Sequence, residues 1–122
     1  MKQVVHYFEE DHLSVAIYDL LYRLGATANY LGFFYVVHAI RLSVEDPSRL
    51  MFVTKWLYPD VAKHYGTNWR AVERDIRTVI NTVWRCQPEL LTEIAGFQIT
   101  EKPGPSRFLS ILTGYIRQGR AA

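Results

Sequence analysis

The sequence predicts an all-α fold, a compact bundle of about six helices that contains a helix-turn-helix. Apolar side chains recur along almost the whole chain at the three- and four-residue spacing of helices, not at the alternating spacing of strands. Proline and glycine stand where helices are expected to begin and end. With 122 residues, 49% of them apolar, the chain can form one domain with a buried core.

The first part of the chain predicts three helices. Residues 13–24 carry one apolar stripe, and Gly25 follows as a typical helix end. An Asp-Pro pair at 46–47 supplies a cap and a first helical position, which predicts a helix that continues to about residue 57. Between these two, a helix over about 28–43 should be deeply packed because it is rich in aromatic side chains, namely Tyr30, Phe33, Phe34 and Tyr35.

The middle of the chain is its most informative part. Pro59 opens a short helix, because proline is tolerated in a first turn, and Gly66 can adopt the positive φ angle that ends it. Thr67 or Asn68 can cap a longer helix that runs to about Cys86. A short helix, a glycine turn and a longer helix form the layout of a helix-turn-helix, which places its second helix in the DNA major groove.

The longer helix, residues 68–86, has two different faces. The spacing typical of a buried stripe is followed by Val72, Ile76, Val79, Ile80 and Val83. The opposite face carries Arg70, Glu73, Arg74, Arg77 and Asn81. An ordinary amphipathic helix also has a charged outer face, so this helix alone leaves two interpretations open. The preceding turn adds support to DNA recognition, and both interpretations stay open at this point.

The last part of the chain predicts two further helices. Pro88 starts a short one that ends near Gly96. Residues 100–106 form the only clear cluster of loop residues, and a last helix follows over about 106–118.

Charge is distributed unevenly along the chain. The net charge of +2 does not indicate a general binder of polyanions. Basic side chains nevertheless outnumber acidic ones in residues 55–85 and 101–122, as expected for a localised contact with nucleic acid. The single cysteine, the absence of a signal-peptide pattern and the absence of a long apolar run predict a cytoplasmic protein without a membrane span.

Other candidate sites favour structural interpretations. The histidines have no metal-ligand spacing and His38 is expected in the core; the four are His6, His12, His38 and His64. The tryptophans are expected in the core, with Trp69 as the one that could instead pack on a sugar-phosphate; they are Trp56, Trp69 and Trp84. Cys86 is expected to be a structural thiol. The lead-in carboxylates Glu9, Glu10 and Asp11 are expected to be solvated. No cofactor, metal or enzymatic activity is predicted.

Two segments carry a resemblance to a known family. Leu57-Tyr-Pro-Asp-Val-Ala-Lys63 and Arg70-Ala-Val-Glu-Arg-Asp-Ile-Arg77 closely resemble the C-terminal effector domain of the stage-zero sporulation master response regulators. The resemblance extends over about residues 14–118 and includes Gly32-Phe-Phe-Tyr-Val-Val-His-Ala-Ile40. It implies a sporulation-type DNA-binding transcription regulator domain at 14–119, after a short acidic lead-in at 1–13.

The resemblance also implies a site. The second helix of the motif would contact a box of the TTCGACA type, with base contacts from Glu73, Arg74 and Arg77. Arginine pairs with guanine O6 and N7, and glutamate accepts from the cytosine amino group. The residues expected to contact phosphates lie at the turn and on the same helix, namely Lys63, His64, Thr67, Asn68, Arg70 and Thr78. The sequence departs from the family pattern at Trp69 and Asp75, where small residues are expected.

Partners follow from the same resemblance. Double-stranded DNA is the expected partner, and the sigma subunit of RNA polymerase is a possible second one, at about residues 84–97. Full-length members carry an N-terminal receiver domain, which this sequence lacks, so it is either an excised domain or a naturally short protein. We expect a monomer in solution that binds DNA constitutively, in tandem or as a dimer. The alternative is an interaction module that binds a full-length regulator or polymerase instead of DNA.

Overall fold

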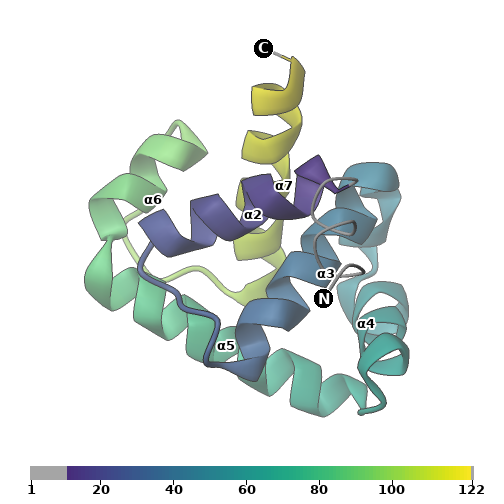
Figure 1. The fold of residues 1–122 in the computed structure, drawn as a ribbon. Helices are drawn as coiled ribbons and strands as arrows, with labels where there is room; N and C mark the ends of the chain where they lie inside the picture. Colours follow the sequence, from purple (N-terminus) through teal and green to yellow (C-terminus); the bar gives the residue numbers. More distant parts are fainter. Residues whose placement is uncertain (1–10, 122) are drawn as a thin grey trace, which may run out of the picture.

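The computed structural model describes residues 11–121, and these form an all-α bundle, as the sequence predicts (Figure 1). No strand occurs within this range. The α-helices are α2 (His12–Arg23), α3 (Leu31–Glu45), α4 (Tyr58–Tyr65), α5 (Trp69–Cys86), α6 (Pro88–Ala95) and α7 (Pro105–Ala121). Between α3 and α4 lie a 3₁₀ turn, η1 (Pro47–Met51), and a π-helical turn, η2 (Val53–Leu57).

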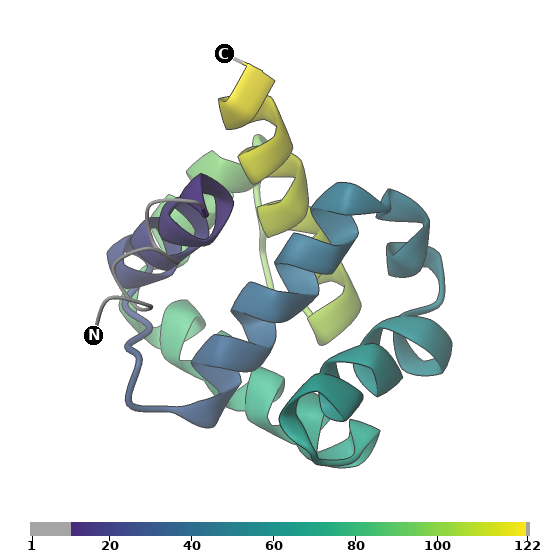
Figure 2. The same ribbon diagram turned by 45° about the vertical axis from the view of Figure 1, so that its right-hand side comes forward.

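Helix α3 crosses the centre of the molecule, and α5 lies along the lower edge of the molecule in both views (Figures 1 and 2). It contacts α2, α4, α5 and α7, so the core gathers around it. Phe33 and Tyr35 of α3 are buried, as the sequence predicts. Tyr30 is 46% exposed because it precedes the helix as its N-cap residue, and Phe34 is half-buried, so the expected deep packing of these aromatic residues is only partly correct.

Glycines end two of the helices at the expected positions. Gly66 follows α4 with φ +67°, and Gly96 follows α6 with φ +81°. Only glycine adopts such angles without a steric cost from Cβ. The glycine after α4 turns the chain directly into α5, so it sets the angle at which the two helices of the motif meet.

The predicted helix over 47–57 is wrong. The chain forms the 3₁₀ turn η1, leaves helical geometry at Phe52 with φ −136° and ψ 60°, and only then coils into η2. The Asp46 side chain does cap this segment, because it accepts from the Ser48 N–H at 3.1 Å. Only Val53 and Leu57 of the two turns are buried, so a regular helix here would lack the apolar face that stabilises one.

Asp11 is not a freely solvated member of the lead-in. Its carboxylate caps α2 by accepting from the Ser14 N–H at 3.0 Å and forms an ion pair with Arg41 of α3. Burial raises the pKa of this carboxyl, but hydrogen bonds from Ser14 and Arg41 outweigh it and hold the pKa below its ordinary value. Glu9 and Glu10 lie outside the described residues, whereas His12 already belongs to α2.

One close approach positions α5 against the centre of the fold. Gly32, in the first turn of α3, lies so near to α5 that an added Cβ would stand 2.2 Å from the backbone oxygen of Asp75. Only hydrogen fits at this point, and the two helices therefore meet backbone to backbone. No helix of residues 11–121 is long and apolar enough to span a bilayer.

Candidate nucleic-acid interface

Helices α4 and α5 form the predicted helix-turn-helix. They pack against each other, and the turn between them is closed by the Thr67 N–H, which donates to the Ala62 carbonyl at 2.9 Å. Asn68 caps α5, because its Oδ1 accepts from the Ala71 N–H at 3.0 Å. The cap satisfies one of the free amides that begin every helix. The first turn of α5 is therefore fixed in place at the surface.

The two faces of α5 are segregated as the sequence predicts. All five residues of the apolar stripe are buried, and they are Val72, Ile76, Val79, Ile80 and Val83. At about 100° per residue, Arg70, Arg77 and Asn81 fall within roughly 40° of one another on the opposite side. Burial of the stripe holds the charged face toward solvent.

The charged side chains of this face are paired only loosely. Arg77 Nη2 lies 3.3 Å from Glu73 Oε2, and Arg74 Nε lies 3.3 Å from Asp75 Oδ1. The Arg77 and Arg74 side chains are 58% and 73% exposed. Such exposed pairs contribute at most about 1 kcal/mol. Both arginines can therefore exchange these carboxylates for another acceptor at little cost.

The remaining expected contact residues lie around the turn. Lys63 and His64 are exposed in the last turn of α4, and Thr67 is half-buried. The Arg70 guanidinium lies over the Trp69 ring, 4.9 Å from its centroid. The Thr78 hydroxyl donates to the Arg74 carbonyl at 3.3 Å, within its own helix. The structure thus brings the expected residues to the turn and to one side of α5.

The chain matches a known protein family over most of its length. The family described as "Sporulation initiation factor Spo0A C terminal" matches residues 17–116 of the 122-residue chain. The chain belongs to the Spo0A C-terminal family. It is therefore a DNA-binding regulator domain of the sporulation type, and this family is regulatory and not a family of enzymes.

Within this Spo0A C-terminal domain, His64 of the motif stacks on His38 of α3. The ring centroids are 4.1 Å apart and the planes are inclined by 17°. The pKa of His38 is lowered from 6.5 to about 4, mainly by burial and then by the charges of His64, Arg41 and Arg49, whereas Asp60 opposes them. His38 is half-buried, so it is less enclosed than expected for a core histidine.

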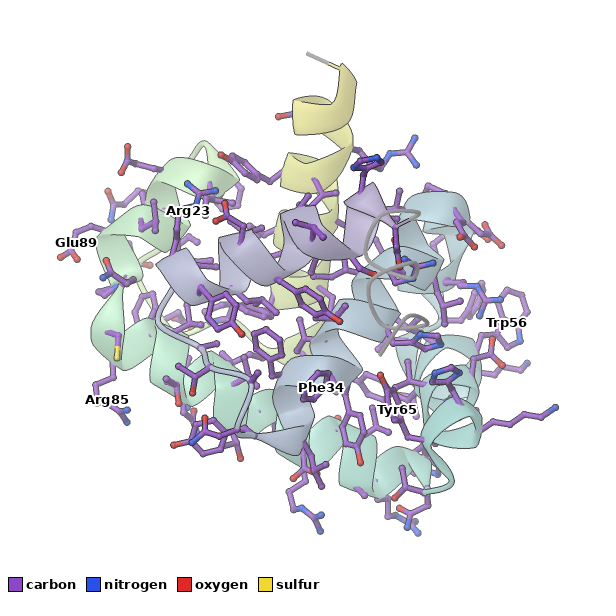
Figure 3. All side chains as sticks on the ribbon, viewed as in Figure 1. Arg23, Phe34, Trp56, Tyr65, Arg85 and Glu89 are labelled. Atoms are coloured by element: carbon purple, nitrogen blue, oxygen red, sulfur yellow. The ribbon has the colours of Figure 1, made fainter. Side chains whose placement is uncertain are left out.

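The tryptophans differ from the sequence prediction in one case. Trp69 and Trp84 are half-buried and pack against the core. Trp56 is 46% exposed, and Figure 3 shows it pointing away from the bundle, because η2 buries only Val53 and Leu57. The expectation of a core position for Trp56 is therefore wrong.

The described residues contain one free cysteine and no cluster of side chains that could bind a metal ion. Cys86 is an exposed free thiol at the end of α5, next to Gly25, whose added Cβ would stand 2.9 Å from the Cys86 Cβ. Among residues 11–121, no three His, Cys, Asp or Glu side chains lie together in a way that could hold a metal ion. His6 lies outside the described residues.

Sequence reasoning missed one cation beside α5. Lys102, in the segment between α6 and α7, donates to Asn81 Oδ1 at 2.5 Å. The two residues are 21 positions apart, and no spacing rule links a loop lysine to a helix asparagine at that distance. The only available signal was the basic excess of residues 101–122.

Proposed function

We propose that α5 is the recognition helix of this regulator domain and enters the major groove of a TTCGACA-like box. Arg74 and Arg77 contact guanine O6 and N7, and Glu73 accepts from a cytosine amino group. The observation that carries the proposal is the charged face of α5, which lies opposite a completely buried stripe. A face held outward in this way can enter a groove without disturbing the core.

The length of this face suits a groove. Arg70 and Arg77 are seven residues apart, which corresponds to about 10 Å along a helix at 1.5 Å per residue. The major groove is about 12 Å wide. The middle of the face can therefore contact base edges while its beginning lies near the phosphates of one strand.

Residues at the turn fix the register on the duplex in this proposal. Lys63, His64 and Arg70 supply charge, and Thr67 supplies a hydroxyl. The Asn68 oxygen is engaged in the cap, so this residue donates to phosphate through its amide NH₂ group. Thr78 donates through its hydroxyl after leaving the Arg74 carbonyl.

A second function is favoured by a specific surface. Between α6 and α7 lies an open hollow of about 370 Å³ whose apolar lining includes Ile94, Phe97 and Ile111, and Phe97 is 48% exposed. This hollow adjoins the segment at 84–97 where contact with the polymerase sigma subunit is expected. An interaction module would use it to bind polymerase or a full-length regulator.

A salt-dependent titration separates the two functions. The chain is titrated against a fluorescent duplex with the TTCGACA box and against a scrambled duplex, at several salt concentrations. The proposal predicts tighter binding to the box at every salt concentration, with affinity that falls as salt rises. Equal affinity for both duplexes would reject sequence-specific recognition and favour the interaction module.

A further inference from the structure

A side chain of α5, the proposed recognition helix, holds Lys102 beside that helix. Its ammonium donates to Asn81 Oδ1 at 2.5 Å, and Asn81 lies on the same side of α5 as Arg70 and Arg77. An ammonium has three donors, so the bond to Asn81 leaves two for another acceptor. The Asn81 amide NH₂ group adds further donors at the same point.

The segment that carries Lys102 is anchored on both sides. Ile99 is buried, and its N–H lies 3.4 Å from the Thr92 hydroxyl oxygen that accepts from it. Pro103 and Pro105 are buried after the lysine. The exposed Lys102 therefore lies between buried neighbours. Because these fix the backbone at Lys102, little further ordering of the segment is needed when the lysine binds a partner.

A shallow hollow of about 100 Å³ lies at this point. It is lined by Arg77, Ile80, Asn81, Lys102 and Pro103. Two cations and an amide thus border one small depression, whose base is apolar. The ligand that suits such a set of donors is a small anionic group with several acceptor oxygens, such as a phosphate.

The position of the hollow along α5 matches the edge of a DNA groove. Asn81 lies four residues beyond Arg77 and seven beyond Arg74, which corresponds to about 6 Å and 10 Å along the helix. Half the width of the major groove is about 6 Å. Arg70 and Asn81 are eleven residues apart, or about 16 Å along the helix. If α5 crosses a groove about 12 Å wide with Arg74 and Arg77 over base edges, both ends of the charged face pass the bases and reach the sugar-phosphate walls, with Lys102 beside Asn81.

We propose that Lys102 and Asn81 bind one backbone phosphate of the DNA, at the end of α5 opposite to the turn. This inference rests on the proposed position of α5 in the major groove. It extends the phosphate contacts from the turn at Lys63–Arg70 to the loop before α7. The recognition helix is then clamped at both ends. Glu101 is exposed next to Lys102, and its carboxylate opposes the contact by repelling the same phosphate.

The test measures how the affinity of Lys102→Gln for the box duplex depends on salt. One phosphate contact contributes about 0.9 to the slope of log affinity against log salt. The slope should fall by that amount, so the ratio of wild-type to variant affinity should shrink about threefold between 50 and 200 mM salt. Lys102→Arg should keep the wild-type slope, and Glu101→Gln should bind more tightly than the wild type.

Arg23→Gln is the matched control. Arg23 is an exposed cation on α2 that pairs with Asp19, and Figure 3 shows it well above α5. The control loses the same charge as Lys102→Gln but should keep the wild-type slope. If the two variants have equal slopes, the clamp is rejected. An equal fall below the wild-type slope in both would be a general effect of lost charge.

Substitution of single phosphates in the DNA locates the contact. Methylphosphonates, which lack the negative charge, are placed one at a time along both strands of the box duplex. One position beyond the bases assigned to Arg77 should weaken the wild type and leave Lys102→Gln unaffected. If every position that weakens the wild type weakens the variant equally, the contact does not exist.

The outcomes separate this inference from the proposed function. A wild-type chain that does not prefer the box rejects both. A wild-type chain that prefers the box, with a slope that Lys102→Gln does not change, rejects only the phosphate site. Because Lys102 is exposed, the variant should fold as the wild type does, and thermal unfolding checks this.

Discussion

Gly32 and Asp75 bring the backbones of α3 and α5 into direct contact, because an added Cβ at Gly32 would lie 2.2 Å from the Asp75 backbone oxygen. Asp75 follows Arg74 in the sequence, but its backbone lies on the side of α5 that faces α3. The contact therefore sets how closely α5 lies against α3. Gly32 thus helps to position the face of α5 that we propose enters the DNA groove.

Gly32→Ala should destabilise the fold. Alanine favours a helix by up to about 1 kcal/mol over glycine, but overpacking against a backbone oxygen costs about 1–3 kcal/mol. The free energy of unfolding in urea should therefore fall. Gly114→Ala in α7 is the control, because its added Cβ meets nothing within 4 Å and should leave stability equal or higher. Equal behaviour of the two variants would refute the close contact.

The close contact at Gly32 also shows what sequence alone could not provide. Both faces of α5 and the turn at Gly66 follow from local spacing and are confirmed, and of the two expected caps, Thr67 or Asn68, the structure shows Asn68. Gly32 needs no unusual φ angle, so only the three-dimensional approach of α5 explains it. The pairing of Lys102 with Asn81 likewise depends on where a loop packs and not on any repeat in the sequence.

The break in the helix expected at residues 47–57 has its cause in tertiary packing. The Asp-Pro start was recognised correctly, and Asp46 does cap the segment. The helix then breaks at Phe52, because the following residues bury only Val53 and Leu57 beside α4. Tertiary packing of a short connection outweighed its apolar spacing, which is the usual limit of reasoning from helical periodicity.

The stability of the fold should decrease in mild acid because of His38. Its pKa of about 4 lies below the ordinary 6.5, so the folded state keeps it neutral while the unfolded state binds a proton. The stability present above pH 6.5 is therefore lost progressively as the pH falls toward 4. His38→Gln should flatten this part of the pH profile in chemical denaturation, and His12→Gln on the exposed start of α2 should not. A steep profile retained in His38→Gln would assign the effect to other groups.

Lys63 should contribute charge and no sequence preference. Lys63→Ala should weaken binding to the box and to scrambled DNA by a similar factor and lower the salt slope by about 0.9. Lys55→Ala, which removes an exposed lysine from η2, should change neither quantity. A loss confined to the box would show that Lys63 contacts a base instead of a phosphate.

The chain should be a monomer in the absence of DNA. Within residues 11–121, the large exposed apolar side chains lie on several elements, and the group that gathers is small, with the Phe52 and Trp56 rings 4.7 Å apart beside Met51; others are Tyr22, Leu31 and Phe97. Stable interfaces bury about 800 Å² on each partner, which scattered side chains do not provide. Sedimentation equilibrium should give the monomer mass, with two copies only on duplexes carrying tandem boxes about 10 bp apart. A stable dimer without DNA would contradict this.

The most direct test of the account is the base specificity of Arg74→Ala. Its affinity is measured for the TTCGACA box and for every single-base-pair variant of that box, beside the wild type. We expect a loss of about 1–3 kcal/mol on the original box, with discrimination lost at one base pair and kept at the others. Equal weakening on all sequences would contradict the placement of α5 in the major groove with Arg74 on a base.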